Sequence, residues 1–165
     1  MAETRLLGVA KIELGAIAAD GDVSASFASP GNIYKDTAEI TQEQEADTEH
    51  FCEEQDEAFA IVPGSKKTKI KFAVTDFTPA ALVALLGGTA AGVAPADTWT
   101  APATTDIIEK SVKITPKSGK TITFPRVSLR AMINYKLAKS GIAQVMVEGT
   151  VMTPTKTGVA AIKIG

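Results

Sequence analysis

Apolar and polar residues alternate with a period of two through much of this chain, which restricts the fold to one built mainly from β-strands. The clearest example is the segment 69–74, in which Ile70, Phe72 and Val74 fall on one side and two lysines fall on the other. A strand with one buried face has this pattern, because successive side chains point to opposite faces of a sheet. The segment therefore predicts a half-buried strand.

Two further regions predict hairpins. Residues 111–124 alternate on both sides of a turn at 116–119 that contains Pro and Gly, and this combination is typical of two strands joined by a tight connection. Valines at alternate positions mark a strand over 145–151, and a Pro- and Gly-containing turn at 153–158 leads into 159–164. The chain is therefore expected to end in a second hairpin.

One short α-helix is predicted over about residues 78–87. Asp76 or Thr78 can cap its first amides, Pro79 suits its first turn, and Gly87 suits the left-handed position that ends a helix. Spacings of three and four predict one apolar stripe, formed by Leu82, Leu85 and Leu86. A helix this short is marginal alone, so we expect it to pack on a sheet.

Length and composition favour one domain spanning residues 1–165. The chain has 165 residues and 45% apolar residues, enough for one hydrophobic core but not comfortably for two. It has no apolar stretch of the roughly 20 residues that cross a bilayer, so we expect neither a signal peptide nor a membrane span. The single cysteine, Cys52, suits a reducing compartment, and synthesis in a cytoplasm is the simplest expectation.

Charge is strongly segregated along the sequence. Between Asp36 and Glu57 there are ten carboxylates and no Lys or Arg, whereas 14 of the 17 basic residues lie between Lys66 and Lys163. If residues 37–45 and 47–54 are strands, parity gathers carboxylates on one face of each. We expect the two stretches to pair as a polar acidic hairpin over about 33–57, with a candidate acidic face formed by Glu39, Glu43, Glu45, Asp47, Glu49 and Glu53.

A long surface loop is expected over about residues 89–105, which are rich in Ala, Thr, Pro and Gly. Loops of this length often carry binding or assembly contacts. The only tryptophan, Trp99, is a candidate anchor for the loop. It can pack against its own domain or insert into a neighbouring molecule, and the sequence does not distinguish these alternatives.

The order of these elements resembles the major tail tube proteins of tailed phages. The most specific part is the lysine-flanked strand beginning at Lys69, followed by Asp76-Phe77-Thr78, the Leu-rich helix and Leu86-Gly87-Gly88-Thr89. An amino-terminal strand region and a Thr- and Glu-rich hairpin precede it, and β-hairpins follow. Residues 92–105 match no feature of the family.

The resemblance implies a mainly β fold of two packed antiparallel sheets, sandwich- or barrel-like, with one flanking helix and long loops or hairpin extensions. It implies that six copies form a ring, that rings stack into a tube, and that DNA passes through the lumen without specific binding. Other tail proteins, such as the tape measure and the terminator, are implied as partners. The implied location is the virion tail, after synthesis in the host cytoplasm.

Three uses of the acidic face remain open. It can line the lumen, where carboxylates would repel DNA phosphates, the reverse of the Lys and Arg contacts that hold DNA. It can contact a basic surface in the next ring, or it can be a solvated edge that prevents unwanted strand pairing. The candidate basic inter-subunit surface consists of Lys67, Lys69, Lys71, Arg126 and Arg130.

No motif predicts catalysis, a metal or a cofactor. The segment 118–121 reads Ser-Gly-Lys-Thr, like the end of a phosphate-binding loop, but Ile114 stands where the first glycine is needed. His50 and Cys52 supply too few ligands for a closed zinc site. We therefore expect a structural, self-assembling tube subunit with no enzyme activity. The alternative is a β-sandwich module that binds a ligand or protein through its long loops.

Overall fold

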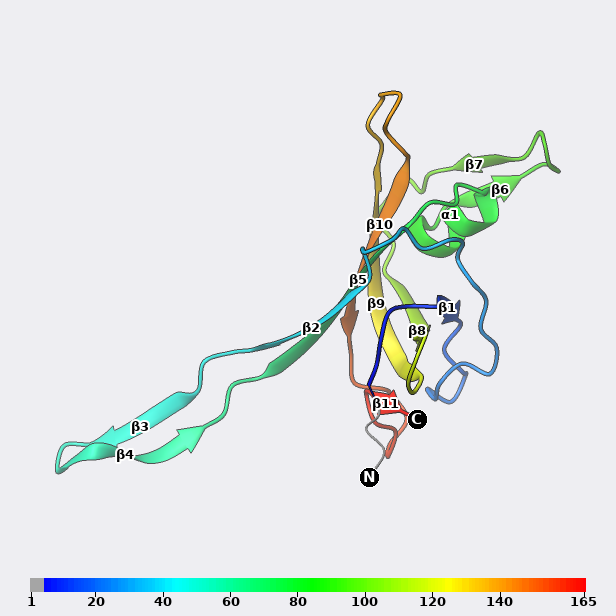
Figure 1. Cartoon of the computed structure of the whole chain (residues 1–165). Helices are drawn as coiled ribbons and strands as arrows, with labels where there is room; N and C mark the ends of the chain where they lie inside the picture. Colours follow the sequence, from blue (N-terminus) through cyan, green and yellow to red (C-terminus); the bar gives the residue numbers. More distant parts are fainter. Residues whose placement is uncertain (1–4) are drawn as a thin grey trace.

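A computed structural model describes residues 5–165 and shows a β-sheet body from which hairpins project (Figure 1). The elements in chain order are β1 (Lys11–Gly15), β2 (Glu39–Gln44), β3 (Thr48–Cys52), β4 (Gln55–Val62), β5 (Lys66–Val74), α1 (Pro79–Leu86), β6 (Thr89–Ala91), β7 (Thr98–Thr100), β8 (Ile108–Thr115), β9 (Ile122–Asn134), β10 (Gln144–Val151) and β11 (Lys163–Ile164).

The body is a seven-stranded sheet with the order β1-β8-β9-β10-β5-β2, and β11 pairs with β9 beside this path. All of its strand pairs are antiparallel. The two small remaining sheets are the β3–β4 and β6–β7 hairpins. The predicted fold class is confirmed, since the protein is mainly antiparallel β with one short flanking helix and hairpin extensions.

Alternation along the central strands creates the core. Val145 of β10 stands opposite Val74 of β5 and Ile133 of β9, and Val147 stands opposite Phe72. The inward side chains of β5, β9 and β10 are almost inaccessible to solvent; they include Ile70, Phe72, Val74, Val127, Leu129, Val145 and Val147. The sequence pattern predicts this burial for β5 and β10. Burial of this one face makes the strand register specific, because a slip of one residue would expose it.

The predicted helix is confirmed as α1, which covers part of this core. The Thr78 hydroxyl accepts a hydrogen bond from the Ala81 amide at 3.4 Å, and Asp76 accepts one from the Thr78 amide at 3.0 Å. Gly87 ends the helix with φ 77°, a left-handed conformation that favours glycine. Leu82 and Leu85 are buried, and Leu86 packs against the core from its edge.

The hairpin predicted over 111–124 is confirmed as β8 and β9, with an irregular register between Lys110 and Val112. At this bulge the buried Ser111 hydroxyl donates to the Pro125 carbonyl at 2.6 Å and accepts from the Ser24 amide at 3.0 Å. The polar atoms exposed by the bulge are thus satisfied inside the protein.

Three expectations about pairing are wrong. The last strand, β11, pairs with Ile122 and Thr123 of β9 rather than with β10. Residues 89–105 are not one loop, since β6 and β7 form a hairpin within them. The two acidic stretches do not pair with each other: β2 pairs with β5, and β3 pairs with β4. The partners of β11 and β2 are distant in the sequence, and β6 and β7 are too short to show a pattern, whereas β3 pairs with the strand that directly follows it.

Candidate assembly surfaces

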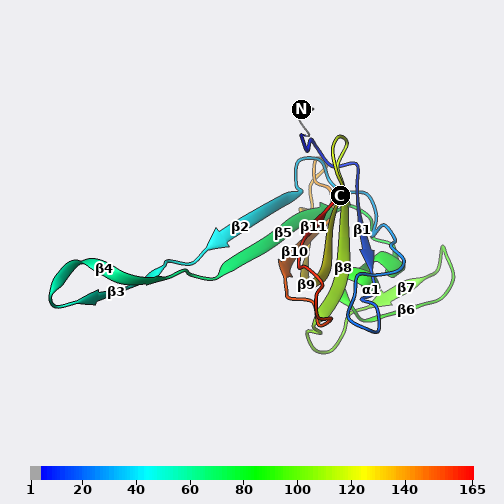
Figure 2. The same cartoon turned by 90° about the horizontal axis from the view of Figure 1, so that it is seen from below.

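A long two-stranded extension, here called the arm, carries most of the acidic segment. Its base consists of β2 paired with residues 66–71 of β5, and its tip consists of residues 48–62, which form β3 and β4. Figures 1 and 2 show the arm leaving the body in one direction, with the β6–β7 hairpin on the opposite side. The predicted acidic hairpin therefore belongs to an excursion that is longer than expected and ends beyond Glu57.

At the arm base, acidic β2 and basic β5 neutralise each other. Glu39 stands opposite Lys71, and Glu43 stands opposite Lys67. The Lys69 ammonium lies 3.0 Å from a Glu43 carboxylate oxygen, and the Lys67 ammonium lies 2.5 Å from Glu45. The hydrogen bond that Lys67 donates to Glu45, together with the negative charge of Glu45, raises the pKa of Lys67. These pairs are exposed, so they fix strand register more than they stabilise the fold.

The alternation of charge continues across the outer face of the sheet. Lys71 stands opposite Glu148 of β10, and Glu148 stands opposite Arg130 of β9. Together with Glu39 they form a row of alternating sign across four strands. Like charges therefore do not face each other in this row, and the face is balanced rather than basic.

Arg126 is also satisfied within the chain. Its guanidinium donates to both carboxylate oxygens of Glu109, at 2.9 and 3.0 Å, and to the Thr153 carbonyl at 3.2 Å. The two-pronged hydrogen bond lowers the pKa of Glu109 and raises that of Arg126. The structure thus places Lys67, Lys69, Lys71, Arg126 and Arg130 next to acidic residues of the same chain.

The carboxylates predicted as one face are divided by the arm. Glu39, Glu43 and Glu45 belong to the base, Asp47 lies at its junction with the tip, and Glu49 and Glu53 belong to the tip. Asp47 accepts a hydrogen bond from the Gly64 amide at 2.9 Å, which joins the two sides of the junction. Residue parity did not reveal the lysines opposite β2, and the register shift between His50 and Cys52 interrupts the alternation in β3.

Among residues 5–165, the arm tip buries no large apolar side chain of its own and forms no ion pair. Its large apolar side chains are exposed, with 57% of Phe51, 61% of Phe59, 57% of Ile61 and 54% of Val62 accessible. Within residues 5–165, no cation pairs with its carboxylates Glu49, Glu53, Glu54, Asp56 and Glu57. A two-stranded hairpin of this kind is marginally stable in water, and clustered apolar exposure marks interaction surfaces.

A second extension prolongs β9 and β10 beyond the core. Its exposed apolar side chains are Met132, Ile133, Tyr135, Leu137, Ile142 and Met146. In Figure 1 it points away from the end of the sheet that holds the β8–β9 turn. The periodic pattern of β10 predicted the strand, but nothing local in the sequence predicted that its outer half stands free of the body.

The β6–β7 hairpin is tied to the body by Trp99. The indole nitrogen donates a hydrogen bond to the Gly87 carbonyl at 2.8 Å, and the ring packs against the edge of the core. The carbonyl belongs to the residue that ends α1, so the hydrogen bond satisfies a group that a helix end leaves free. Of the two alternatives for Trp99, the structure places it against its own domain.

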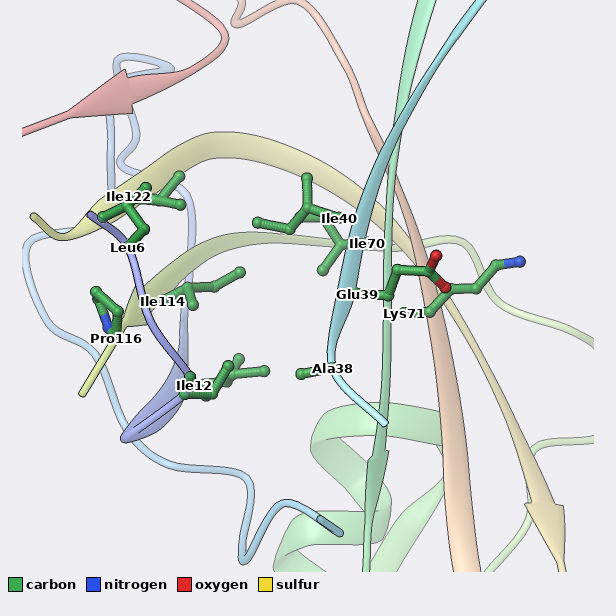
Figure 3. Close-up of a pocket in the computed structure, with 12 residues that line it drawn as sticks. Leu6, Ile12, Ala38, Glu39, Ile40, Ile70, Lys71, Ile114, Pro116 and Ile122 are labelled. Atoms are coloured by element: carbon green, nitrogen blue, oxygen red, sulfur yellow. The ribbon is translucent and has the colours of Figure 1, made fainter. Parts of the chain in front are cut away.

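An apolar groove lies between the two edge strands of the main sheet. The sheet curves so that β1 and β2 approach each other, and the groove between them has a volume of about 250 Å³. In Figure 3, Ile12, Ile114 and Ile122 point into it from one side, and Ile40 and Ile70 from the other. Glu39 and Lys71 lie at its border and point away from it. The groove is also the root of the arm, since β2 begins here.

An ion-pair cluster links the start and end of the chain. The Lys156 ammonium lies 2.7 Å from carboxylate oxygens of both Asp20 and Asp22. These hydrogen bonds lower the pKa of both aspartates and raise that of Lys156. The cluster holds the connection after β10 against the loop that follows β1, and it lies apart from the arm.

The described residues contain no cluster of His, Cys, Asp and Glu suited to hold a metal ion. Nor does any helix in residues 5–165 have the length and apolar character needed to span a membrane.

Comparison with known proteins gives structural likenesses but no match in sequence. No family model and no curated protein matches the sequence. Among solved structures, the chain resembles the tail of an empty GTA particle computed with helical refinement and C6 symmetry. The TM-score is 0.47 and the identity 13%, over 97% of this chain and 95% of the other. A likeness of this size bears on neither fold nor function.

Proposed function

We propose that this protein is a structural subunit that assembles with copies of itself into hexameric rings, which stack into a phage tail tube that conducts DNA. The observation that carries the proposal is the arm tip, where Phe51, Phe59, Ile61 and Val62 are all more than half exposed. A hairpin that buries none of its large apolar side chains within its own chain needs a partner surface. The resemblance of residues 69–89 to major tail tube proteins indicates which kind of assembly to expect, namely stacked hexameric rings.

Assembly also accounts for the other extension. The outer half of the β9–β10 pair exposes Tyr135, Leu137 and Ile142 well away from the arm. A subunit of a stacked ring contacts neighbours within its ring and in the rings above and below. Separate apolar surfaces that point in different directions meet that requirement, whereas a monomeric binding module needs only one.

The charge distribution favours a particular role for the acidic segment. A strongly acidic lumen wall needs carboxylates without facing cations, but Glu39, Glu43 and Glu45 lie beside the lysines of β5. Where the arm base faces the lumen, its wall is therefore charge-balanced and neither repels nor holds phosphate strongly. The unpaired carboxylates of the tip are better suited to meet a basic surface of another subunit.

The remaining parts of the proposal follow from this role. The protein has no catalytic activity and needs no cofactor; its partners are other copies of itself, tail proteins such as the tape measure and terminator, and DNA in transit. Its place is the virion tail, after synthesis in the host cytoplasm. The runner-up is a β-sandwich module that holds a ligand, for which the apolar groove between β1 and β2 is the best site.

Native mass and electron microscopy of the purified full chain test the proposal. Hexamers and rings with sixfold symmetry are expected, and stacked tubes at higher protein concentration. A monomer at every accessible concentration contradicts tube assembly and favours the binding module. In a gel-shift measurement at physiological salt, assembled rings should not retain duplex DNA on their outer surface.

A further inference from the structure

The arm tip and the groove are two unmatched surfaces of one chain. The tip offers exposed Phe51 and Phe59 among carboxylates that have no cationic partner within residues 5–165. The groove offers an apolar lining of about 250 Å³ between β1 and β2. Engineered cavities of ~150 Å³ already hold a benzene molecule, so the groove has room for a phenyl ring.

Positively charged side chains lie beside the groove, whereas the tip carries only carboxylates. Pro116 lines the groove, and the turn that follows it carries the exposed Lys117 and Lys120. The Lys117 side chain also lies against Gly8, another lining residue. Neither lysine has a carboxylate partner among residues 5–165. Glu39 and Lys71 at the border stand opposite each other, so Lys117 and Lys120 are the cations left to meet an acidic tip. An acidic apolar tip and an apolar groove beside these two lysines are complementary in both respects.

The two surfaces of one molecule cannot meet. The arm begins at the groove, where Ala38 and Ile40 form part of the lining. It then leaves the body along a continuous ladder from the Glu39–Lys71 pair to the Gln44–Lys66 pair. Figures 1 and 2 both show the tip at the far end of this ladder, directed away from the body. Only the tip of another molecule can enter the groove.

We propose that the groove between β1 and β2 of one copy receives the arm tip of a second copy, with a phenylalanine of the tip in the groove and its carboxylates against Lys117 and Lys120. Each copy then donates one tip and accepts one. An interface of this head-to-tail kind joins two different surfaces, and it closes into a ring when the rotation between copies closes. The inference rests on the proposed self-assembly and identifies the surfaces that perform it.

Cys52 provides a direct test, because it is the only cysteine and is exposed at the arm tip. We would replace Lys117 by Cys in the full chain and treat assembled protein with a short bis-maleimide. Cross-linked species of two to six copies are expected for Lys117→Cys. The matched control is Lys136→Cys, since Lys136 is an exposed lysine in the extension that joins β9 to β10. This variant should cross-link no more than the wild type does through Cys52 alone.

A charge-reversal cycle gives an independent readout that does not depend on cross-linking geometry. Glu53→Lys with Glu54→Lys, or Lys117→Glu with Lys120→Glu, should each raise the concentration for half-maximal ring formation about tenfold. All four changes together should restore ring formation. As a control, Lys136→Glu with Lys139→Glu should not rescue the tip variant. All of these side chains are exposed, so the body should fold normally in each variant.

The outcomes separate the two proposals. Failure of the wild type to form rings overturns the proposed function, and this inference with it. Rings that form normally, without cross-linking at residue 117 and without charge-swap rescue, overturn the inference alone. An assembled structure with a small apolar molecule or a different segment in the groove also overturns it.

Discussion

The body and the arm tip are both antiparallel β-structure, yet they are stabilised in different ways. In the body, Phe124 is 1% exposed and belongs to a continuous cluster of buried aliphatic and aromatic residues. In the tip, Phe59 is 61% exposed, and its ring lies 6.3 Å from the His50 ring, measured between centroids. Hydrogen-bonded strands alone therefore do not make a stable unit; burial of one face does.

This difference distinguishes the region that is stabilised within one chain from the region that needs assembly. The body buries its apolar face within its own sheet and helix, whereas the apolar side chains of the tip stay exposed and need a partner to bury them. Natural proteins keep apolar strands exposed only where a binding role offsets the risk of aggregation. The contrast can be measured by applying the same kind of change to both regions.

The largest difference is expected between two phenylalanine truncations. Phe124→Ala leaves a cavity in the body and should lower the free energy of unfolding by about 3–5 kcal/mol. Phe59→Ala in the tip should change that of the monomer by no more than about 0.5 kcal/mol. Urea denaturation followed by circular dichroism measures both. Equal losses would show that the tip contributes to the monomer's cooperative fold and would remove the contrast.

A smaller effect is expected at the β6–β7 hairpin, which is intermediate between body and tip. Trp99→Phe keeps an aromatic ring but removes the donor to the Gly87 carbonyl. Loss of this hydrogen bond should cost about 1 kcal/mol, and amides of residues 89–100 should exchange faster. Tyr135→Phe, on the other extension, is the matched aromatic control. A loss as large for Tyr135→Phe as for Trp99→Phe would argue against a specific role for the indole.

The smallest effect is expected for stability at acidic pH, to which the ion pairs of Lys156 with Asp20 and Asp22 in the body should contribute. Because Lys156 lowers the pKa of Asp20 and Asp22 below the ordinary value of 3.8, their contribution to stability is present above that value. It is lost as pH falls through the lowered folded-state values. Thermal unfolding at pH 5 and near pH 2 should show this loss in the wild type. The double variant Asp20→Asn with Asp22→Asn, and separately Lys156→Gln, should show a weaker pH dependence. An unchanged slope in both would contradict the role of this cluster.

Local patterns in the sequence were sufficient for the elements that carry their own signal. Alternation at Ile70, Phe72 and Val74 identified β5 and its buried face, and the cap residues around Thr78 and Gly87 identified α1. The turn after Thr115 identified the β8–β9 hairpin. Each of these signals lies within about a dozen neighbouring residues and reflects a physical requirement at that place.

Partner choice could not be predicted in the same way. Parity placed Glu39 and Glu43 on one face but did not show that Lys71 and Lys67 would stand opposite them. The pairing of β11 with β9 likewise depends on how the whole sheet curves. The strands β6 and β7 have three residues each and lack apolar alternation, so they left no signal beyond Trp99. The groove exists only once both sheet edges are placed.

Hydrogen exchange of residues 48–62, compared between monomer and assembled protein, tests the central claim most directly. Amides in the arm tip should exchange quickly in the monomer, where no core protects them, while β5 and β10 in the body stay protected. After assembly, the tip should become protected, together with the strand edges that border the groove. A tip that is already protected in the monomer, or still unprotected in assembled rings, would contradict the account.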